Sequence, residues 1–542
     1  MSTQKEQYSY VERVVSDNSS KNGLDKTETM GTVKLTAGKT IYIPTPTADP
    51  QDPLNMKTWQ KLVVTVLVSI FSTLGLALVS GFGGLLGFYI PEYAASGHGT
   101  YEAISRLLTF PSLFMGIGNL IGMPLAIAVG RRSVLLGSTI ILVVSAILSA
   151  CAKTYEWHLG ARMFMGLAAG QSEAVVPMVV QEIYFLHERS RGLMIQQTVQ
   201  VILSTIWTLF ASPIAGAITP QGWYYLGAGL AAVQFILTLF FLPETKYERS
   251  LGAYQEKAAS KPLSDAENAQ GTSQGEDLAT ERPALDFVNY APRTWRSDMR
   301  LWVGTPEWSK AFTVLVQTFT VLIFPNVFWA MLLNGLTLGV NIAIGITYGG
   351  IVTSAPYNWA QSSASYANCG QIVTALAALP LLGYGSDLII KWKANRNGGI
   401  HEPESRLIPL IIPIIVGTFT AVLYGQAAAH PNQYHWFTVV WAIAAYYFAF
   451  VGANIVAITY LLDSYPARAG PILVNICAFR GIISFGTTYA ITPFINRCGY
   501  DGSFGAYAGM TAGIGLLAIP VYFYGKRIRG FTARFAKDKH TA

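Results

Sequence analysis

The chain has 542 residues, of which 51% are hydrophobic and 12% are charged, whereas about 25% of the residues in an average soluble protein are charged. This composition excludes an ordinary soluble protein and indicates a membrane protein. The net charge of +7 follows from basic residues placed in loops, as described below, and therefore does not indicate nucleic-acid binding.

The first 60 residues are polar and predict a tail that precedes the membrane region. Apolar runs follow that are long enough, at about 1.5 Å per residue, to cross a hydrocarbon core of roughly 30 Å. We place the first six transmembrane helices at 61–90, 104–129, 133–152, 158–184, 192–218 and 222–242.

A polar segment, 244–317, interrupts this series and has little apolar periodicity, which predicts a flexible linker with a short ordered part near DFVNYAPRTW. Six more apolar runs lie after it, at 320–351, 364–390, 405–427, 435–462, 468–492 and 504–525, and a tail covers 527–542. The sequence predicts an all-α membrane protein with twelve transmembrane helices in two six-helix halves, 61–243 and 318–526.

Basic residues gather in alternate loops. Arg131 and Arg132 follow the second predicted helix, and Arg189 and Arg191 the fourth. Two more basic residues follow the sixth and three follow the eighth, whereas the remaining loops hold few. By the positive-inside rule, both tails, the linker and these loops should be cytoplasmic. Anchoring at this surface is sufficient by itself to explain each loop arginine.

The four cysteines, Cys151, Cys369, Cys477 and Cys498, lie in or beside apolar runs and lack the spacing of a metal site. The chain also has no GxxxxGK[ST] phosphate loop, so ATP is not the expected energy source. We expect no metal, no cofactor and no enzymatic activity, because no cluster of histidines or nucleophile–base pair lies within the predicted helices.

Short motifs occur in the same order as in a known family. The first half contains DPQDPLNMKTWQK, GRR at 130–132, RMFMGLAAG at 162–170, YFLHER at 184–189, SPIAG at 212–216 and PET at 243–245; the second contains PYNW, GSD ending at Asp387, EPESRL and DSYPARAG. This order resembles the major facilitator superfamily, and within it the fungal twelve-span drug:proton antiporter-like branch that includes carriers of histidinol and polyamines. The chain departs from the pattern at Met56, Ile127 and Ala128, where the family has Trp, Asp and Arg.

The resemblance implies a carrier that works by alternating access, with loops that join the two halves in one state and separate in the other. The loop residues that we expect to act as this switch are Gly130, Arg131, Arg132, Arg191 and Asp387. Asp387 should lie beside the start of the fifth helix, where exposed N–H groups and Arg191 favour a negative charge. The alternative is a solvated acid without a role.

Two residues in the fifth helix, Pro213 and Gly216, belong to a loose form of the antiporter signature of the family. Proline allows a helix to bend within a membrane, and glycine allows helices to approach each other closely. We expect a bend at this position, while packing alone explains either residue equally well.

Ionisable groups inside membrane helices are costly unless they are paired or face water, and are therefore candidates for function. Arg162 and Glu173 are 11 residues apart in the fourth helix, which places them on one face about 16 Å apart. The family motif implies proton coupling for Arg162. The position of Glu173 within the helix suggests that it is a cavity acid that exchanges protons. Structural bonds between helices are the alternative for both. Arg480 in the eleventh helix is a third candidate, whereas Glu182 and Asp463 are expected to lie in loop networks.

Amide side chains at membrane depth complete the predicted cavity: Asn334, Asn341, Asn454 and Asn475. Aromatic rings with a carboxylate would suit an organic cation. A single amide of this kind is more often an inter-helix contact than a substrate contact.

We therefore expect a secondary active transporter that moves a small organic solute, cationic or amphipathic, across the lipid bilayer with protons and in the direction of export. Uptake of a cationic metabolite and a receptor built on a carrier fold are the alternatives. The family suggests a monomer, and we favour the plasma membrane over an internal, vacuolar membrane.

Overall fold

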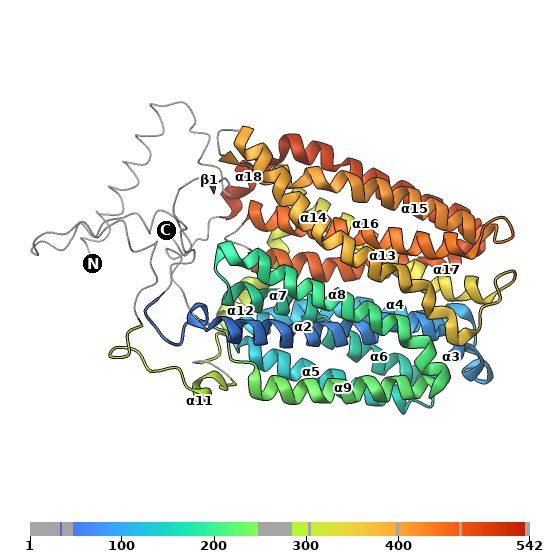
Figure 1. Ribbon diagram of the computed structural model, residues 1–542, viewed down its shortest axis with the longest axis horizontal. Helices are drawn as coiled ribbons and strands as arrows, with labels where there is room; N and C mark the ends of the chain where they lie inside the picture. Colours follow the sequence, from blue (N-terminus) through green and yellow to red (C-terminus); the bar gives the residue numbers. More distant parts are fainter. Residues whose placement is uncertain are drawn as a thin grey trace, which may run out of the picture.

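The structure is a computed structural model that describes residues 33–34, 47–247, 285–301, 305–396, 400–465 and 469–536. Long helices run side by side along one axis, with the first half in the lower part of Figure 1 and the second half in the upper part. We call the end of the bundle near α11 (Trp295–Asp298) the linker end, and the opposite end, near α3 (Leu86–Glu92), the far end.

The first half is built from long helices with short connections. Its elements are η1 (Pro53–Asn55), α2 (Thr58–Ser80), the 3₁₀ turn η2 (Gly81–Leu85), α3, η3 (Ala94–Ser96), α4 (Tyr101–Ala128), α5 (Arg131–Ala150), α6 (Tyr155–Ala169), α7 (Gln171–Ile183), α8 (Leu186–Ala217) and α9 (Pro220–Phe241). Threonine side chains at positions 100, 154 and 219 accept hydrogen bonds from the first turns of α4, α6 and α9 and so fix where these helices begin.

The second half follows the same plan. Its elements are α12 (Trp308–Val321), α13 (Pro325–Thr353), η5 (Gln361–Asn368), α14 (Cys369–Arg396), η6 (Pro403–Leu410), α15 (Ile411–Ala429), α16 (Trp436–Ser464), α17 (Ala469–Leu516) and α18 (Ala518–Ala536). A short antiparallel pair joins β1 (Val33–Lys34) to β2 (Ile400–His401).

Ten segments of the described chain are long and apolar enough to cross a membrane. The last of them, Gly470–Thr532, reverses direction at Gly499, where φ is 73°, and therefore crosses twice. With α14, which lies between η5 and η6 and has 28 residues, this gives the predicted arrangement of twelve membrane helices in two halves. The all-α prediction is confirmed, and within the described residues only the short β1–β2 pair is added.

The linker differs from its prediction at one point. Residues 308–317 were expected to be part of a flexible segment, but they form most of α12, which packs against α4 and α17. Ala311, Thr318 and Val321 of this helix are buried, whereas Phe312 and Val316 on another side are exposed. The buried residues recur at helical spacing on one side of α12 and pack it against the bundle. The polar residues just before them made this part of the sequence look like a linker.

The two halves pack through pairs of interface helices. α4 lies against α17, and α8 lies against α14. Glycines permit the closest approach: a Cβ atom on Gly481 of α17 would lie 2.9 Å from the Cα atom of Gly116 in α4. Small residues thus bring the helices of opposite halves close enough for side chains to interact across the interface.

Candidate functional site

An ion pair joins the two halves between α7 and α17. The Glu173 carboxylate on α7 pairs with the Arg480 guanidinium on α17, and the two side chains are only 11% and 5% exposed. Arg480 Nη1 also donates a hydrogen bond to Asn454 Oδ1 on α16, at 2.8 Å. The Cys477 thiol, one turn before Arg480, donates to the backbone oxygen of Glu173 at 3.3 Å. Two residues of the second half therefore hold Glu173 of the first half, and Asn454 in turn holds the guanidinium of one of them.

Each charge of this pair depends on the other. A buried carboxylate or guanidinium without a partner is strongly unfavourable, whereas a paired and hydrogen-bonded one is tolerated. Arg480 Nε is buried and has no hydrogen-bond partner within the described structure. The guanidinium therefore retains one free donor beside Glu173, to which a polar group of a ligand can bind.

Arg162 lies apart from this ion pair. It is fully buried and donates to the backbone oxygens of Leu107, Leu78 and Val79 and to the Tyr224 hydroxyl, at 2.6, 3.2, 2.9 and 3.0 Å. Its guanidinium also lies 4.1 Å from the centre of the Phe82 ring. All of these groups belong to the first half, so Arg162 connects α6 to its neighbours there, and its role in proton coupling stays a prediction.

The predicted cavity amides are separated. Asn454 belongs to the ion-pair network, but Asn334 donates to Ala330 O of its own helix at 3.0 Å, and Asn475 donates to Thr318 O of α12 at 2.8 Å. The Oδ1 atoms of Asn334 and Asn475 are buried without a partner in the described structure. Asn341 is half-buried. The structure thus brings together Glu173, Arg480 and Asn454 of the seven residues that we predicted.

The loop arginines bind inside the first half and to the linker. Arg131 pairs with Glu182 at 2.6 Å, and Thr245 donates to the other Glu182 oxygen at 2.8 Å. Arg132 is buried and donates to backbone oxygens of Leu242 and Met299, at 2.8 and 2.5 Å. In this arrangement, carbonyl and carboxylate oxygens of the first half and the linker bind both guanidinium groups. The side chains of Arg191 and Asp387 lie outside the described residues, so the switch role remains a prediction.

Glu244 organises this loop and was not among the predicted residues. Its carboxylate accepts hydrogen bonds from the backbone N–H groups of Arg131, Arg132 and Lys246 at 3.0, 3.1 and 2.9 Å, and so caps the start of α5. Burial raises the pKa of the Glu244 carboxyl, although these hydrogen bonds oppose the shift. Gly130 has a φ of 139°, and a Cβ atom there would lie 2.4 Å from Glu244 Oε2. The spacing of GRR and PET in the sequence did not reveal this contact.

The predicted bend residues of α8 lie where the halves meet at the far end. Pro213 is inside α8, and a Cβ atom on Gly216 would lie 2.7 Å from the Ser362 Cβ atom in η5. Next to them, Ser212 of α8 and Ser365 of η5 approach to 2.6 Å between their hydroxyl oxygens. Ser212 also donates to Gly84 O in η2 at 2.7 Å. We call the contacts of η2, α8, α13 and η5 in this region the far-end seal.

Two ion pairs in the second half lie at the linker end. Arg406 of η6 pairs with Asp463 of α16, which agrees with the expectation that Asp463 lies in a loop network. Arg529 of α18 forms a bidentate ion pair with Glu404 of η6: Nε donates to Oε1 and Nη2 to Oε2, each at 2.8 Å, and both side chains are buried. These contacts attach α18 to the rest of the half and explain the EPESRL motif as structural.

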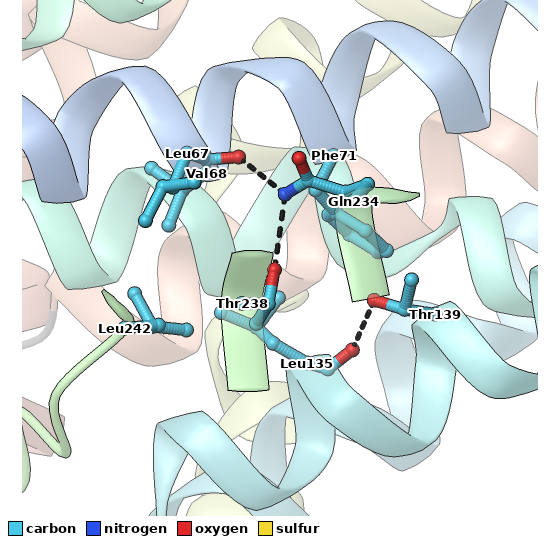
Figure 2. Close-up of a pocket in the computed structure, with 8 residues that line it drawn as sticks. All are labelled: Leu67, Val68, Phe71, Leu135, Thr139, Gln234, Thr238 and Leu242. Carbon is cyan, nitrogen blue, oxygen red and sulfur yellow. Dashed lines mark hydrogen bonds between the residues drawn. The ribbon is translucent and has the colours of Figure 1, made fainter. Parts of the chain in front are cut away.

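Figure 2 shows a narrow gap inside the first half, between α2, α5 and α9. Gln234 fills part of it and donates to Leu67 O at 2.8 Å and to Thr238 Oγ1 at 3.0 Å. The remaining space is too small for a water molecule. This gap contains no ionisable group and is therefore a packing defect and not a solute site.

The sequence and the fold were compared with known proteins. The sequence profile of the Major Facilitator Superfamily matches residues 72–471. An MFS-type transporter of Schizosaccharomyces pombe is 24% identical over 92% of this chain and 89% of its own length. The Major facilitator superfamily multidrug transporter FLU1 of Candida albicans is also 24% identical, over 89% of this chain and 74% of its own. Among solved structures, the partially occluded inward open conformation of the xylose transporter XylE from E. coli superimposes with a TM-score of 0.54 at 13% identity, over 85% of this chain and 98% of that chain.

Proposed function

Since the chain belongs to the Major Facilitator Superfamily and is a multi-pass membrane transporter, we propose that it exports a small cationic or amphipathic organic solute in exchange for protons. The single observation that carries this proposal is the ion pair between Glu173 and Arg480 across the two halves. The name of the multidrug transporter from Candida albicans supports export of organic compounds. We further propose action as a monomer in the plasma membrane, within the fungal drug:proton antiporter-like branch.

The ion pair offers a direct way to couple a proton to a cation. In the present arrangement, Arg480 neutralises Glu173. A cationic solute would compete with the guanidinium for the same carboxylate, and a proton on Glu173 would abolish its attraction for both. Proton and solute therefore exclude each other at one residue, which is the requirement for exchange.

The same event changes the contact between the halves. Glu173 is on α7 of the first half, whereas Arg480 and Asn454 are on helices of the second half. Loss of the ion pair weakens this contact and leaves Arg480 free to bind the acceptor groups of a solute through Nε. Binding at the site thus biases the equilibrium between the two carrier states.

The purified protein in proteoliposomes tests the proposal. A panel of organic cations, neutral drugs and sugars is supplied on one side, and a pH gradient is imposed or omitted. We expect flux of a cation that is accelerated by the gradient and accompanied by proton movement in the opposite direction, recorded with a pH-sensitive dye. Solute flux that is indifferent to the gradient would contradict proton exchange, and solute binding without flux would favour a receptor.

A further inference from the structure

A histidine lies inside the first half, away from the Glu173 ion pair. His158 is on α6, one turn before Arg162, and is fully buried near the far end. Aromatic rings surround it, with the Tyr89 ring centre at 4.9 Å and the Phe82 ring centre at 5.7 Å. An imidazole is the side chain whose charge changes most readily near neutral pH, so its neighbours determine what a proton there would do.

Hydrogen bonds connect this imidazole to Arg162. His158 Nδ1 is 3.1 Å from the Tyr93 hydroxyl, and Nε2 is 2.9 Å from the Tyr224 hydroxyl. The Tyr224 hydroxyl also accepts a hydrogen bond from Arg162 Nη1 at 3.0 Å. One hydroxyl group is therefore shared between a neutral imidazole and a permanent cation.

The number of donors decides which protonation state fits. Because Tyr224 accepts from Arg162, its own hydrogen can be donated to His158 Nε2, while Nδ1–H is donated to the Tyr93 oxygen. All three groups are then satisfied with a neutral imidazole. In the charged imidazolium, both nitrogens are donors, so Tyr224 would have to accept twice while its hydrogen loses its acceptor, and two positive charges would share one oxygen.

Arg162 in turn holds the segment that forms the far-end seal. Its Nη1 and Nη2 groups donate to Leu78 O and Val79 O in the last turn of α2. The chain continues directly into η2, where a Cβ atom on Gly83 would lie 2.6 Å from Gly345 O of α13 and Gly84 O accepts from Ser212. The position of Arg162 therefore determines where η2 meets the second half.

We propose that His158 is a proton-binding residue that controls the far-end seal: a proton on its imidazole displaces Arg162 from Tyr224, releases the end of α2 and loosens η2 from α13 and η5. The effect follows from linkage, since a proton that is disfavoured in the sealed arrangement binds more tightly when the seal is open and shifts the equilibrium toward that state. Acid should therefore open the far end.

The groups that face the imidazole support this assignment. Within the described structure, those that touch it are the hydroxyls of Tyr93 and Tyr224 and the rings of Tyr89 and Phe82, with Arg162 one hydroxyl away. The nearby carboxylates are at the surface, where Glu92 accepts from Gln221 at 3.0 Å and Glu156 lies 3.7 Å from His98. Tyr155 on the same helix donates its hydroxyl to Ala103 O. The imidazolium would thus meet a cation without a buried counter-charge.

Thiol labelling of the seal tests this proposal without any measurement of transport. Ser365 is fully buried in the seal, so a Ser365→Cys variant, in which the native cysteines are replaced, reports its opening. The purified protein is held in nanodiscs, where a water-soluble reagent reaches both ends, and is labelled between pH 5 and 8. A second protein that retains only Cys151, which is exposed, corrects for the pH dependence of the reagent.

We expect the corrected labelling rate of Ser365→Cys to rise at least threefold on acidification. In the His158→Gln background it should not change with pH, because glutamine can accept and donate hydrogen bonds but does not become charged. Tyr224→Phe, which removes the shared hydroxyl, should lower the response while leaving Arg162 bonded to the α2 carbonyls. An equal rise in His158→Gln and in the parent would overturn the proposal, as would a parent whose labelling is independent of pH.

Folding of the variants is checked by the melting temperature at pH 8, the end of the range at which the seal should be closed. A His158→Gln protein that fails to fold is replaced by Tyr224→Phe as the deciding variant: a full acid response in that protein would contradict transmission through the hydroxyl. The readout is independent of solute flux, so its failure leaves the function proposed for Glu173 unaffected.

Discussion

Glu173 on α7 and Arg480 on α17 form an ion pair that connects the two halves of the protein through side chains that are 89% and 95% removed from solvent. Asn454 binds the same guanidinium from a third helix. Three residues that lie far apart in the sequence thus meet at the interface that must rearrange during transport.

The ion pair leads to a prediction about stability. Arg480→Gln leaves the Glu173 carboxylate buried without its counter-charge and should lower the free energy of unfolding by about 3 kcal/mol or more. In the double variant Glu173→Gln with Arg480→Gln, no charge is left unpaired and most of the loss should be recovered. Thermal unfolding of the purified proteins in detergent measures both. If the stability losses of Arg480→Gln and of Glu173→Gln alone simply add in the double variant, the two groups do not interact.

The loop around Gly130 provides a second prediction. Gly130→Ala places a residue with a Cβ atom at a positive φ angle, and this atom would press against the Glu244 carboxylate. The change should therefore displace the cap of α5 and lower the free energy of unfolding by about 1–3 kcal/mol. Gly137→Ala is the matched control, because a Cβ atom at this position in the same helix meets nothing within 4 Å. Equal melting temperatures for the two variants would show that Glu244 does not depend on Gly130.

The orientation in the membrane provides a third prediction. Both tails and the linker should be cytoplasmic because basic residues gather at that end. Val288 in the linker is 93% exposed, and native Cys151 is exposed at the far end. Two proteins with a single cysteine each are compared in intact cells, one with native Cys151 and one with Val288→Cys. An impermeant thiol reagent should label the first protein but not the second. Labelling at position 288 before the cells are permeabilised would reverse the assigned topology.

Asp387 is the subject of a fourth prediction. If it stabilises one carrier state by meeting the start of α8, then Asp387→Asn should slow transport several-fold while membrane abundance stays close to that of the parent. Asp286→Asn is the control, a change of the same type at a half-buried linker residue whose carboxylate binds residues of its own turn. Normal flux through the Asp387→Asn protein would show that this acid has no role in the switch.

The fold was largely predictable from the sequence because the hydrocarbon core requires long uninterrupted apolar runs. The α9 helix illustrates this: it was predicted at 222–242 and extends over Pro220–Phe241. By contrast, α12 was missed, since few of its residues are buried and it follows polar residues directly. Amphipathic helices of this kind are recognised only when the surface against which they pack is known.

The site was only partly predictable. The cost of charges in a membrane singled out Glu173 and Arg480 as candidates. It could not indicate that they bind each other, since that depends on how α7 and α17 are placed across the interface. The same reasoning could not indicate that Arg162 lies apart from this pair, because its partners include backbone oxygens, which leave no signal in the sequence. Glu244 was missed for the same reason, because it binds backbone N–H groups.

The most direct test of the central claim is the pH profile of transport by Glu173→Gln, because this change imitates the protonated acid with little change of shape. The variant should fold, reach the membrane and transport a neutral solute at an appreciable rate. Its transport of a cationic solute should fall at least tenfold. In a His158→Gln background, which removes the pH response proposed for the far-end seal, the remaining flux should no longer vary between pH 5 and 8, since the group on which proton and solute compete is gone. Transport of the cation at the parent rate with an unchanged pH profile would contradict the account, and the coupling acid would then have to be sought at Glu182, Asp463 or Asp387.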